Sequence, residues 1–171
     1  MRGIEINAKL PKIIATHEDA IKWGEIIMQG AQEVMTKAEG HELMPMLFGV
    51  TANKSLNICP LNMPNDRAKD KIQEIVSFFV EKTESIAIVL ISDGWLKDAH
   101  NRERIGEAIT GIVATSEGKM GLICAYSRND ENMPTFEAVY RVDGMQSRFL
   151  PDDVTMLPWH DMKIMPDAIT H

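Results

Sequence analysis

The chain has 171 residues, of which 44% are hydrophobic and 25% are charged, and its formal net charge is −7. These values are ordinary for a globular protein, so they exclude a largely disordered chain and favour one packed core. The negative charge makes nonspecific nucleic-acid binding unlikely as a function class, because that affinity comes mainly from Lys and Arg side chains that neutralise phosphates.

The cysteines and the apolar runs indicate the cellular compartment. The N-terminal residues lack the apolar stretch of a signal peptide, and no run of about 18 apolar residues is present to span a membrane. Cys59 and Cys124 lie far apart in apolar settings and lack metal-ligand spacing, so we expect both to be small buried side chains. The sequence therefore predicts a cytoplasmic protein with no membrane association, no metal and no cofactor.

The clearest predicted helix begins after Thr16. Thr16 is expected to cap the helix, with Asp19 in place of the usual Glu of a capping box. Gly40 is expected to end it. Apolar and small residues recur along one face at helical spacing, at Ala20, Trp23, Gly24, Ile27, Met28, Ala31, Val34, Met35 and Ala38.

A β-hairpin and a second helix are predicted next. The apolar run in 43–51, the polar turn 52–55 and the alternating residues 56–59 are typical of a hairpin. The second helix is expected from about 68 to 83. Its apolar face consists of Ala68, Ile72, Ile75, Val76, Phe79 and Val80.

The second half of the chain reads mainly as strands. The β-branched run 85–92 predicts a central strand that is covered on both faces, and the charged stretch 93–105 predicts a connection. Residues 107–115 and 119–127 predict an antiparallel hairpin, followed by a further strand over 135–142. This order predicts an α+β fold, in which a mostly antiparallel sheet of about six strands has both main helices packed on one face.

Residues 1–144 are expected to form this single α+β domain, whereas 145–171 read as an irregular C-terminal arm. The arm contains scattered large apolar side chains, of which Phe149, Leu157 and Trp159 are candidate interface residues. We expect the arm to pack on the domain or on a partner subunit. It favours a homodimer.

The charged connection 93–104 is the candidate functional site, because it follows a predicted central strand. Asp93 and His100 are the candidate catalytic residues, as a base or ligand and as a group that exchanges protons near neutral pH. Trp95, Arg102 and Arg104 are candidate binding residues, since guanidinium groups hold anions. The alternative interpretation is a solvated loop whose Trp95 packs on the core.

One resemblance rests on this region. The sequence Ile91-Ser92-Asp93-Gly94-Trp95, followed by a polar loop, Arg104 through Glu107 and a predicted hairpin, resembles a group of small uncharacterised bacterial and phage proteins. The similarity covers about residues 64–130. It implies the same kind of fold and a microbial or phage origin, and it carries no activity.

Other catalytic chemistries have weaker signals. Glu117-Gly118-Lys119, with Asp93 upstream, matches the acidic and lysine residues of one class of magnesium-dependent nucleases, but Ser116 and Gly118 indicate a turn rather than the required strand. His17 and His41 each precede a Glu without the second His of a zinc protease motif.

Two functions remain open at this point. The favoured hypothesis is a non-catalytic binding or assembly protein of bacterial or phage origin that forms a homo-oligomer. The alternative is a small hydrolase or anion-binding protein that uses the 93–104 loop, and a magnesium-dependent nuclease is a distant third. Neither hypothesis specifies a small-molecule ligand.

Overall fold

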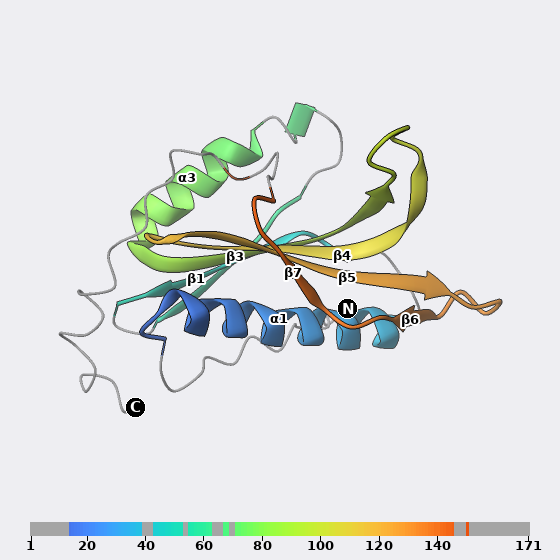
Figure 1. Cartoon of the computed structure of the whole chain (residues 1–171). Coiled ribbons are helices and arrows are strands. Elements are labelled where there is room, and N and C mark those ends of the chain that lie inside the picture. The colour runs from blue at the N-terminus through green and yellow to red at the C-terminus, as the bar shows by residue number, and fades with distance from the viewer. Residues whose placement is uncertain are drawn as a thin grey trace.

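A computed structural model describes residues 14–38, 43–52, 55–62, 67–68, 71–145 and 150. The helices and strands follow one another in a simple order (Figure 1). They are α1 (His17–Lys37), β1 (Met46–Thr51), β2 (Leu56–Pro60), α3 (Ile72–Thr83), β3 (Ser85–Lys97), β4 (Arg104–Thr115), β5 (Gly118–Arg128), β6 (Pro134–Phe136) and β7 (Tyr140–Val142).

The strands form one open, seven-stranded sheet in the order β2-β1-β3-β4-β5-β6, and β7 also pairs with β5. Every pairing is antiparallel. The predicted α+β class with an antiparallel sheet is therefore confirmed, as are the hairpins β1–β2 and β4–β5.

The two helices lie on opposite faces of the sheet, and the prediction that both pack on one face is wrong (Figure 1). Along β3, Val89 and Ile91 belong to the core cluster that contains α1. Ile88 and Leu90 belong to the cluster that contains α3. Successive side chains of a strand point to opposite faces, so a strand that is apolar on both faces needs a cover on each.

Helix α1 begins as its sequence predicts. The Thr16 hydroxyl accepts a hydrogen bond from the backbone N–H of Asp19 at 3.1 Å, and the Asp19 carboxylate accepts one from the N–H of Ala15 at 2.9 Å. These bonds satisfy backbone donors that a helix start leaves unpaired. The expected stop at Gly40 lies outside the described residues, and α1 ends at Lys37 with Ala38 as its C-cap.

Two strand predictions differ from the structure. The stretch 93–105 is not a loop, because β3 continues to Lys97 and β4 begins at Arg104. The stretch 135–142 is not one strand, because residues 137–139 separate β6 from β7. The N–H of Glu137 still donates to the carbonyl of Ala125 at 2.8 Å, which holds this break against β5.

The cysteines and the C-terminal segment complete the comparison. Both thiols are free; Cys124 is buried as expected, whereas Cys59 is only partly buried. Leu150, from the predicted C-terminal arm, is buried in the cluster with α3. None of the described helices is long and apolar enough to cross a bilayer.

Helix α1 approaches the sheet closely at Gly24. A Cβ atom at this position would lie 2.4 Å from Cγ2 of Val113 and 3.0 Å from Cδ1 of Leu122. Both neighbours belong to the buried core, so they have little space into which to retreat.

We expect Gly24→Ala to destabilise the protein by roughly 1–3 kcal/mol, because overpacking outweighs the gain in helix propensity of about 1 kcal/mol. Urea denaturation measures the change. A variant that is more stable than the wild type would show that α1 shifts freely on the sheet and would contradict this packing.

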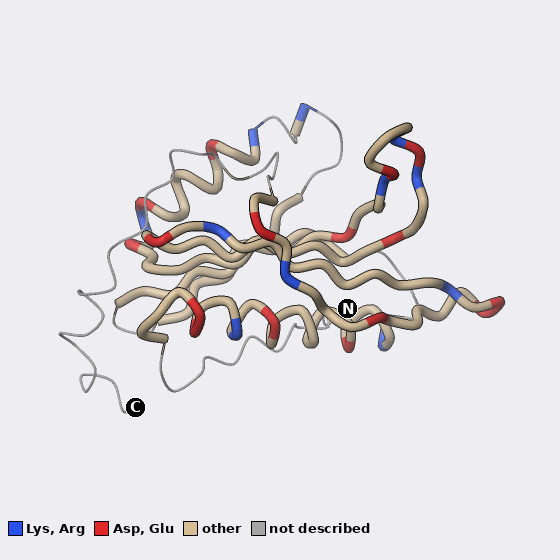
Figure 2. The backbone as a smooth tube through the Cα atoms, viewed as in Figure 1, with Lys and Arg blue, Asp and Glu red and all other residues tan. Residues whose placement is uncertain are grey.

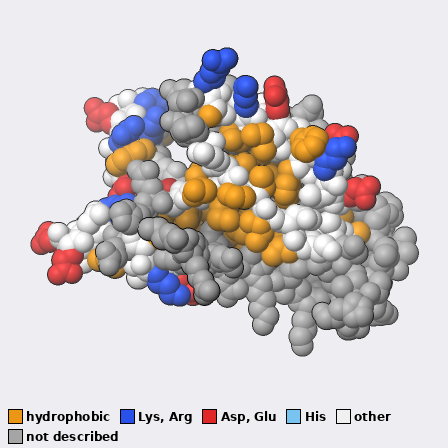
Figure 3. All heavy atoms as spheres, turned by 180° about the vertical axis from the view of Figure 1, so that it is seen from behind, with side chains coloured by type: hydrophobic (Ala, Val, Ile, Leu, Met, Phe, Trp, Pro, Cys, Tyr) orange, Lys and Arg blue, Asp and Glu red, His pale blue; other side chains and the backbone are white. Residues whose placement is uncertain are grey.

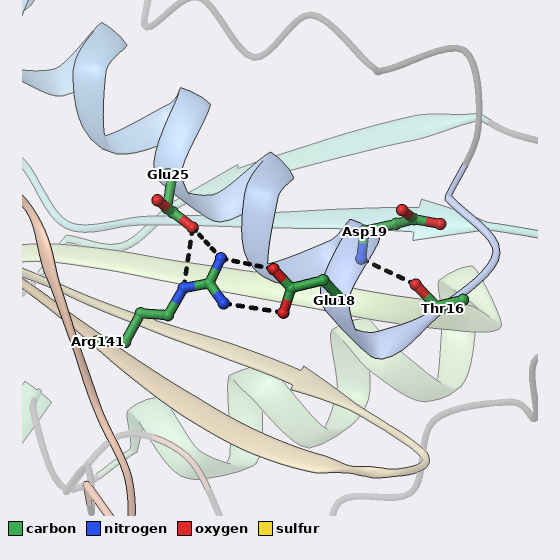
Figure 4. A network of polar contacts seen from close by, with 5 residues as sticks. All are labelled: Thr16, Glu18, Asp19, Glu25 and Arg141. Carbon is green, nitrogen blue, oxygen red and sulfur yellow. Dashed lines mark hydrogen bonds and ion pairs between the residues drawn. The ribbon is translucent and has the colours of Figure 1, made fainter.

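Strand β7 is fastened to α1 by one side chain (Figure 4). The Arg141 guanidinium donates two hydrogen bonds of 2.8 Å to the two carboxylate oxygens of Glu18, and it also bonds Glu25 through its Nε at 3.1 Å. Hydrogen bonding to Arg141 lowers the pKa of Glu18. A three-residue edge strand is thereby tied to a helix, although this network lies at the surface, where salt screens it.

We expect Arg141→Gln to lower the free energy of unfolding modestly in dilute buffer and to have little effect in 1 M NaCl, where the Debye length is about 3 Å. The depressed pKa of Glu18 gives a stabilisation that is present above the carboxyl's unfolded pKa and is lost as the pH falls through its folded pKa. Thermal melts at two salt concentrations measure the first effect, and melts at a series of pH values measure the second. An equal loss at high salt would mean that packing, not charge, fastens β7.

Candidate functional site

Three neighbouring strands bring four polar side chains together on the sheet face that α1 covers. We call them the hairpin-base cluster; they are Asp93 on β3, Glu107 on β4, and Tyr126 and Arg128 on β5. Trp95 pairs with Glu107, and Glu107 pairs with Tyr126, so these positions share a face. Asp93 and Arg128 lie two residues away from that row and therefore on the same face.

The centre of the cluster is a hydrogen bond between a phenol and a carboxylate. The hydroxyl of Tyr126 donates to Oδ1 of Asp93 at 2.7 Å, and the N–H of Gly94 donates to the same oxygen at 3.0 Å. Burial raises the pKa of Asp93, whereas bonds from Tyr126 and from the backbone of Leu43 and Gly94 oppose that rise. Burial and the Asp93 bond also raise the pKa of Tyr126, which keeps the phenol protonated as a donor.

The other two members of the cluster neutralise each other. Nε of Arg128 donates to Oε2 of Glu107 at 2.9 Å, with both side chains mostly buried. The guanidinium lies 5.4 Å from the ring centroid of Tyr126, which packs at 5.6 Å against Phe136. The cluster thus joins β3, β4 and β5 at the point where the β3–β4 hairpin leaves the packed sheet.

Beyond this cluster, residues 94–106 form a projecting two-stranded hairpin, which we call the hairpin arm. It bends away from the sheet toward the side of α3 (Figure 1). A Cβ atom at Gly94 or at Gly106 would meet no atom of the other described residues within 4 Å. The register shifts where Lys97 pairs with Arg104, and such a bulge bends and twists a strand pair.

The tip of the arm is closed by Asp98. Its carboxylate accepts hydrogen bonds from the N–H groups of His100 at 2.8 Å and Asn101 at 3.0 Å, and these bonds lower its pKa. The backbone of Asp98 also bonds to Glu103 and Arg102. Arg102 has a positive φ of 64°, the left-handed conformation that tight turns use. The tip is therefore an ordered turn.

The sides of the arm carry exposed apolar surface. The Trp95 side chain is 51% exposed, and the guanidinium of Arg104 lies 4.7 Å from its ring centroid. Ile105, at the bulge, is 67% exposed. Along the backbone of the arm, Lys and Arg positions alternate with Asp and Glu positions (Figure 2).

The structure separates the predicted site residues into two groups. Asp93 lies in the hairpin-base cluster, while His100 and Arg102 lie at the exposed tip of the arm. Trp95 and Arg104 are brought together by stacking between them. The candidate interface residues Phe149, Leu157 and Trp159 lie outside the described residues.

The sequence pattern does not single out Glu107, Tyr126 and Arg128 as members of the site. The available signal was the turn 116–118, because counting back from it along both strands pairs Glu107 with Tyr126. Of the nuclease-like residues, Glu117 lies in the turn between β4 and β5, where its carboxylate accepts the N–H of His17 at 3.2 Å, and Lys119 lies in β5. The same counting places Asp93 in this region of the sheet, because β3 pairs with β4 from Ala87–Thr115 onward and Asp93 lies opposite Ile109.

Within the described part of the chain, no three His, Cys, Asp or Glu side chains are grouped so that they could hold a metal ion. Comparisons with protein-family models, with curated proteins and with solved structures found no significant match. The likeness over residues 64–130 to small bacterial and phage proteins therefore stays a prediction.

We expect Asp93→Asn to change how stability depends on pH. Burial raises the pKa of Asp93 above its unfolded value, so the native protein keeps this proton over a pH range in which the unfolded chain has lost it. Wild-type stability relative to the variant should therefore fall as the pH rises through the carboxyl's unfolded pKa and then through its higher folded pKa. Urea denaturation at a series of pH values measures this difference.

Tyr126→Phe is the companion variant for that experiment. It removes the donor that holds the carboxylate form of Asp93, so the fall in stability should extend to higher pH than in the wild type. A wild-type stability that instead rises with pH relative to Asp93→Asn would mean that the hydrogen bonds outweigh burial.

Proposed function

We propose that this protein is a non-catalytic binding and assembly protein that forms a homo-oligomer and binds a partner through the hairpin arm. The observation that carries the proposal is the half-exposed Trp95, which lies under Arg104 on an arm that projects from the packed sheet. Tryptophan and arginine are enriched among the residues that dominate binding energy at protein interfaces.

The charges of the arm indicate what kind of surface it fits. The arm contains three cationic side chains and two carboxylates. The cationic residues are Lys97, Arg102 and Arg104, and the acidic residues are Asp98 and Glu103. The carboxylate of Asp98 is already engaged by two backbone donors of the turn. The arm is thus relatively cationic on a protein of net charge −7, and a partner with an apolar surface and an acidic rim would complement it.

The alternative of a hydrolase draws no support from the geometry. It requires Asp93 and His100 to converge on a substrate, but they lie at the base and at the tip of the arm. The Asp93 carboxylate is bonded to Tyr126 and Gly94. These contacts explain Asp93 as the group that anchors the arm to the sheet.

The proposal also places the protein in a reducing cytoplasm and assigns it a bacterial or phage origin. Free thiols at Cys59 and Cys124 support such a compartment, because disulfides are rare in the cytosol. The origin rests only on the resemblance of the Ile91–Trp95 and Arg104–Glu107 segments.

A side chain kept for binding contributes little to folding. We expect Trp95→Ala to change the free energy of unfolding by less than about 1 kcal/mol, because the arm is exposed. Trp23→Ala is the matched control: that side chain is fully buried, and its loss should cost roughly 3–5 kcal/mol. A loss at Trp95 as large as that at Trp23 would assign Trp95 to the folding core and contradict a binding role.

A further inference from the structure

We infer that the edge of β2 that no described strand covers is the surface through which two copies of this chain meet, by antiparallel pairing of β2 with β2 of the second copy. This inference rests on the homo-oligomer of the proposed function and names the surface that forms it. A pairing of identical strands places the same residues on both sides of a two-fold axis, as in most homodimers.

The direction of the β2 backbone groups supports this inference. The N–H of Thr51 donates to the carbonyl of Ser55, and the N–H of Leu61 donates to that of Pro45. In the β1–β2 register these are hydrogen-bonded pairs, so the alternate pairs Gly49–Asn57 and Leu47–Cys59 are hydrogen-bonded too. Leu56 and Ile58 therefore direct their N–H and C=O groups away from β1, to the edge that pairs with no other strand in the described part of the chain.

One register of the proposed β2–β2 pair forms hydrogen bonds with all of the outward N–H and C=O groups of Leu56 and Ile58. A two-fold axis at Asn57 sets Leu56 opposite Ile58 of the second copy, and both residues of each pair then donate and accept. An axis at Ile58 would instead set Leu56 opposite Pro60, which has no N–H to give. The first register forms a continuous sheet across the two copies without unpaired groups between Leu56 and Ile58.

Charge makes a second copy the fitting occupant. The sequence of β2, Leu56-Asn57-Ile58-Cys59-Pro60, contains no charged residue, whereas the chain carries a net charge of −7. A self-contact brings like charges together, so an uncharged surface is suited to it. Natural edge strands usually carry charges that prevent such pairing. Arg141 meets that description on β7, at the other edge of the sheet, where it is bound to Glu18 and Glu25.

Exposed apolar side chains lie on both faces of the sheet. Viewed from behind, hydrophobic side chains gather in a patch with charged side chains around its rim (Figure 3). Ile58 on β2 is 47% exposed and lies on the face of α1, since its partner Phe48 belongs to the cluster that contains α1. Ile75 and Phe78 on α3, which are 42% and 61% exposed, lie on the opposite face. Cys59 of β2 packs against the core cluster that includes Ile72 and Val76 of α3, so the strand edge and the helix are contiguous. Pairing at β2 would bring apolar surface from both copies together.

Two variants test the edge in different ways. Leu56→Pro removes one outward N–H while leaving the β1 ladder intact, because that N–H does not bond β1. Ile58→Lys places a charge at the centre of the self-contact. Ile26→Lys is the matched control, since Ile26 is 38% exposed on α1, which packs mainly on β4 and β5, away from β2.

Sedimentation equilibrium of the full chain measures association. We expect a wild-type dimer whose dissociation constant rises by about tenfold or more in Leu56→Pro and in Ile58→Lys, and stays unchanged in Ile26→Lys. A wild-type dimer that neither edge variant weakens would overturn the β2 surface while leaving the proposed assembly function intact. A wild type that remains monomeric at every concentration would overturn the homo-oligomer itself.

Hydrogen exchange of the wild type provides a measurement that needs no substitution. The amides of Leu56 and Ile58 should exchange more slowly as protein concentration rises, because pairing protects them. The amides of Asn57 and Cys59 bond β1 within the chain and should be protected at all concentrations. Exchange at Leu56 and Ile58 that is fast and independent of concentration in the dimer would contradict pairing at this edge.

Discussion

The burial of β3 on both faces is the constraint on which the rest of the structure depends. Its apolar side chains point alternately to the two sides of the sheet, and each side is covered by a different helix. Removal of apolar surface from water is the main favourable contribution to folding, so β3 holds α1 and α3 in place on opposite faces. The remaining strands extend outward from this centre on both sides.

Where the two-sided burial of β3 ends, polar interactions replace apolar packing in holding the strands together. Beyond Ile91 the side chains of β3 are no longer packed on both faces, and the hairpin-base cluster holds the three strands with hydrogen bonds and one ion pair. Buried polar groups are tolerated only when they are paired, and these are. The cluster allows the hairpin arm to project with Trp95 exposed, which is the basis of the proposed binding role.

Local patterns accounted for most of the elements. The Thr16 cap, the one-faced periodicity of α1 and the apolar run of β3 correctly located these segments, because capping and burial periodicity are encoded in nearby residues. The local sequence of the arm predicts a loop, since its residues are charged, whereas its strand pairing depends on β4. Only part of the site could be predicted for the same reason: Asp93 and Trp95 stand out in sequence, whereas Tyr126 and Arg128 join them through the register of β5.

The sequence by itself determined the α+β class, the antiparallel hairpins and the central position of β3, because each follows from residues that are close along the chain. Tertiary structure alone decided that the helices occupy opposite faces, that Asp93 meets Tyr126 and that β2 lies at the edge with Leu56 and Ile58 directed outward. These features depend on which strands become neighbours and in what register. Contacts between residues distant in sequence set both, and no local pattern records them.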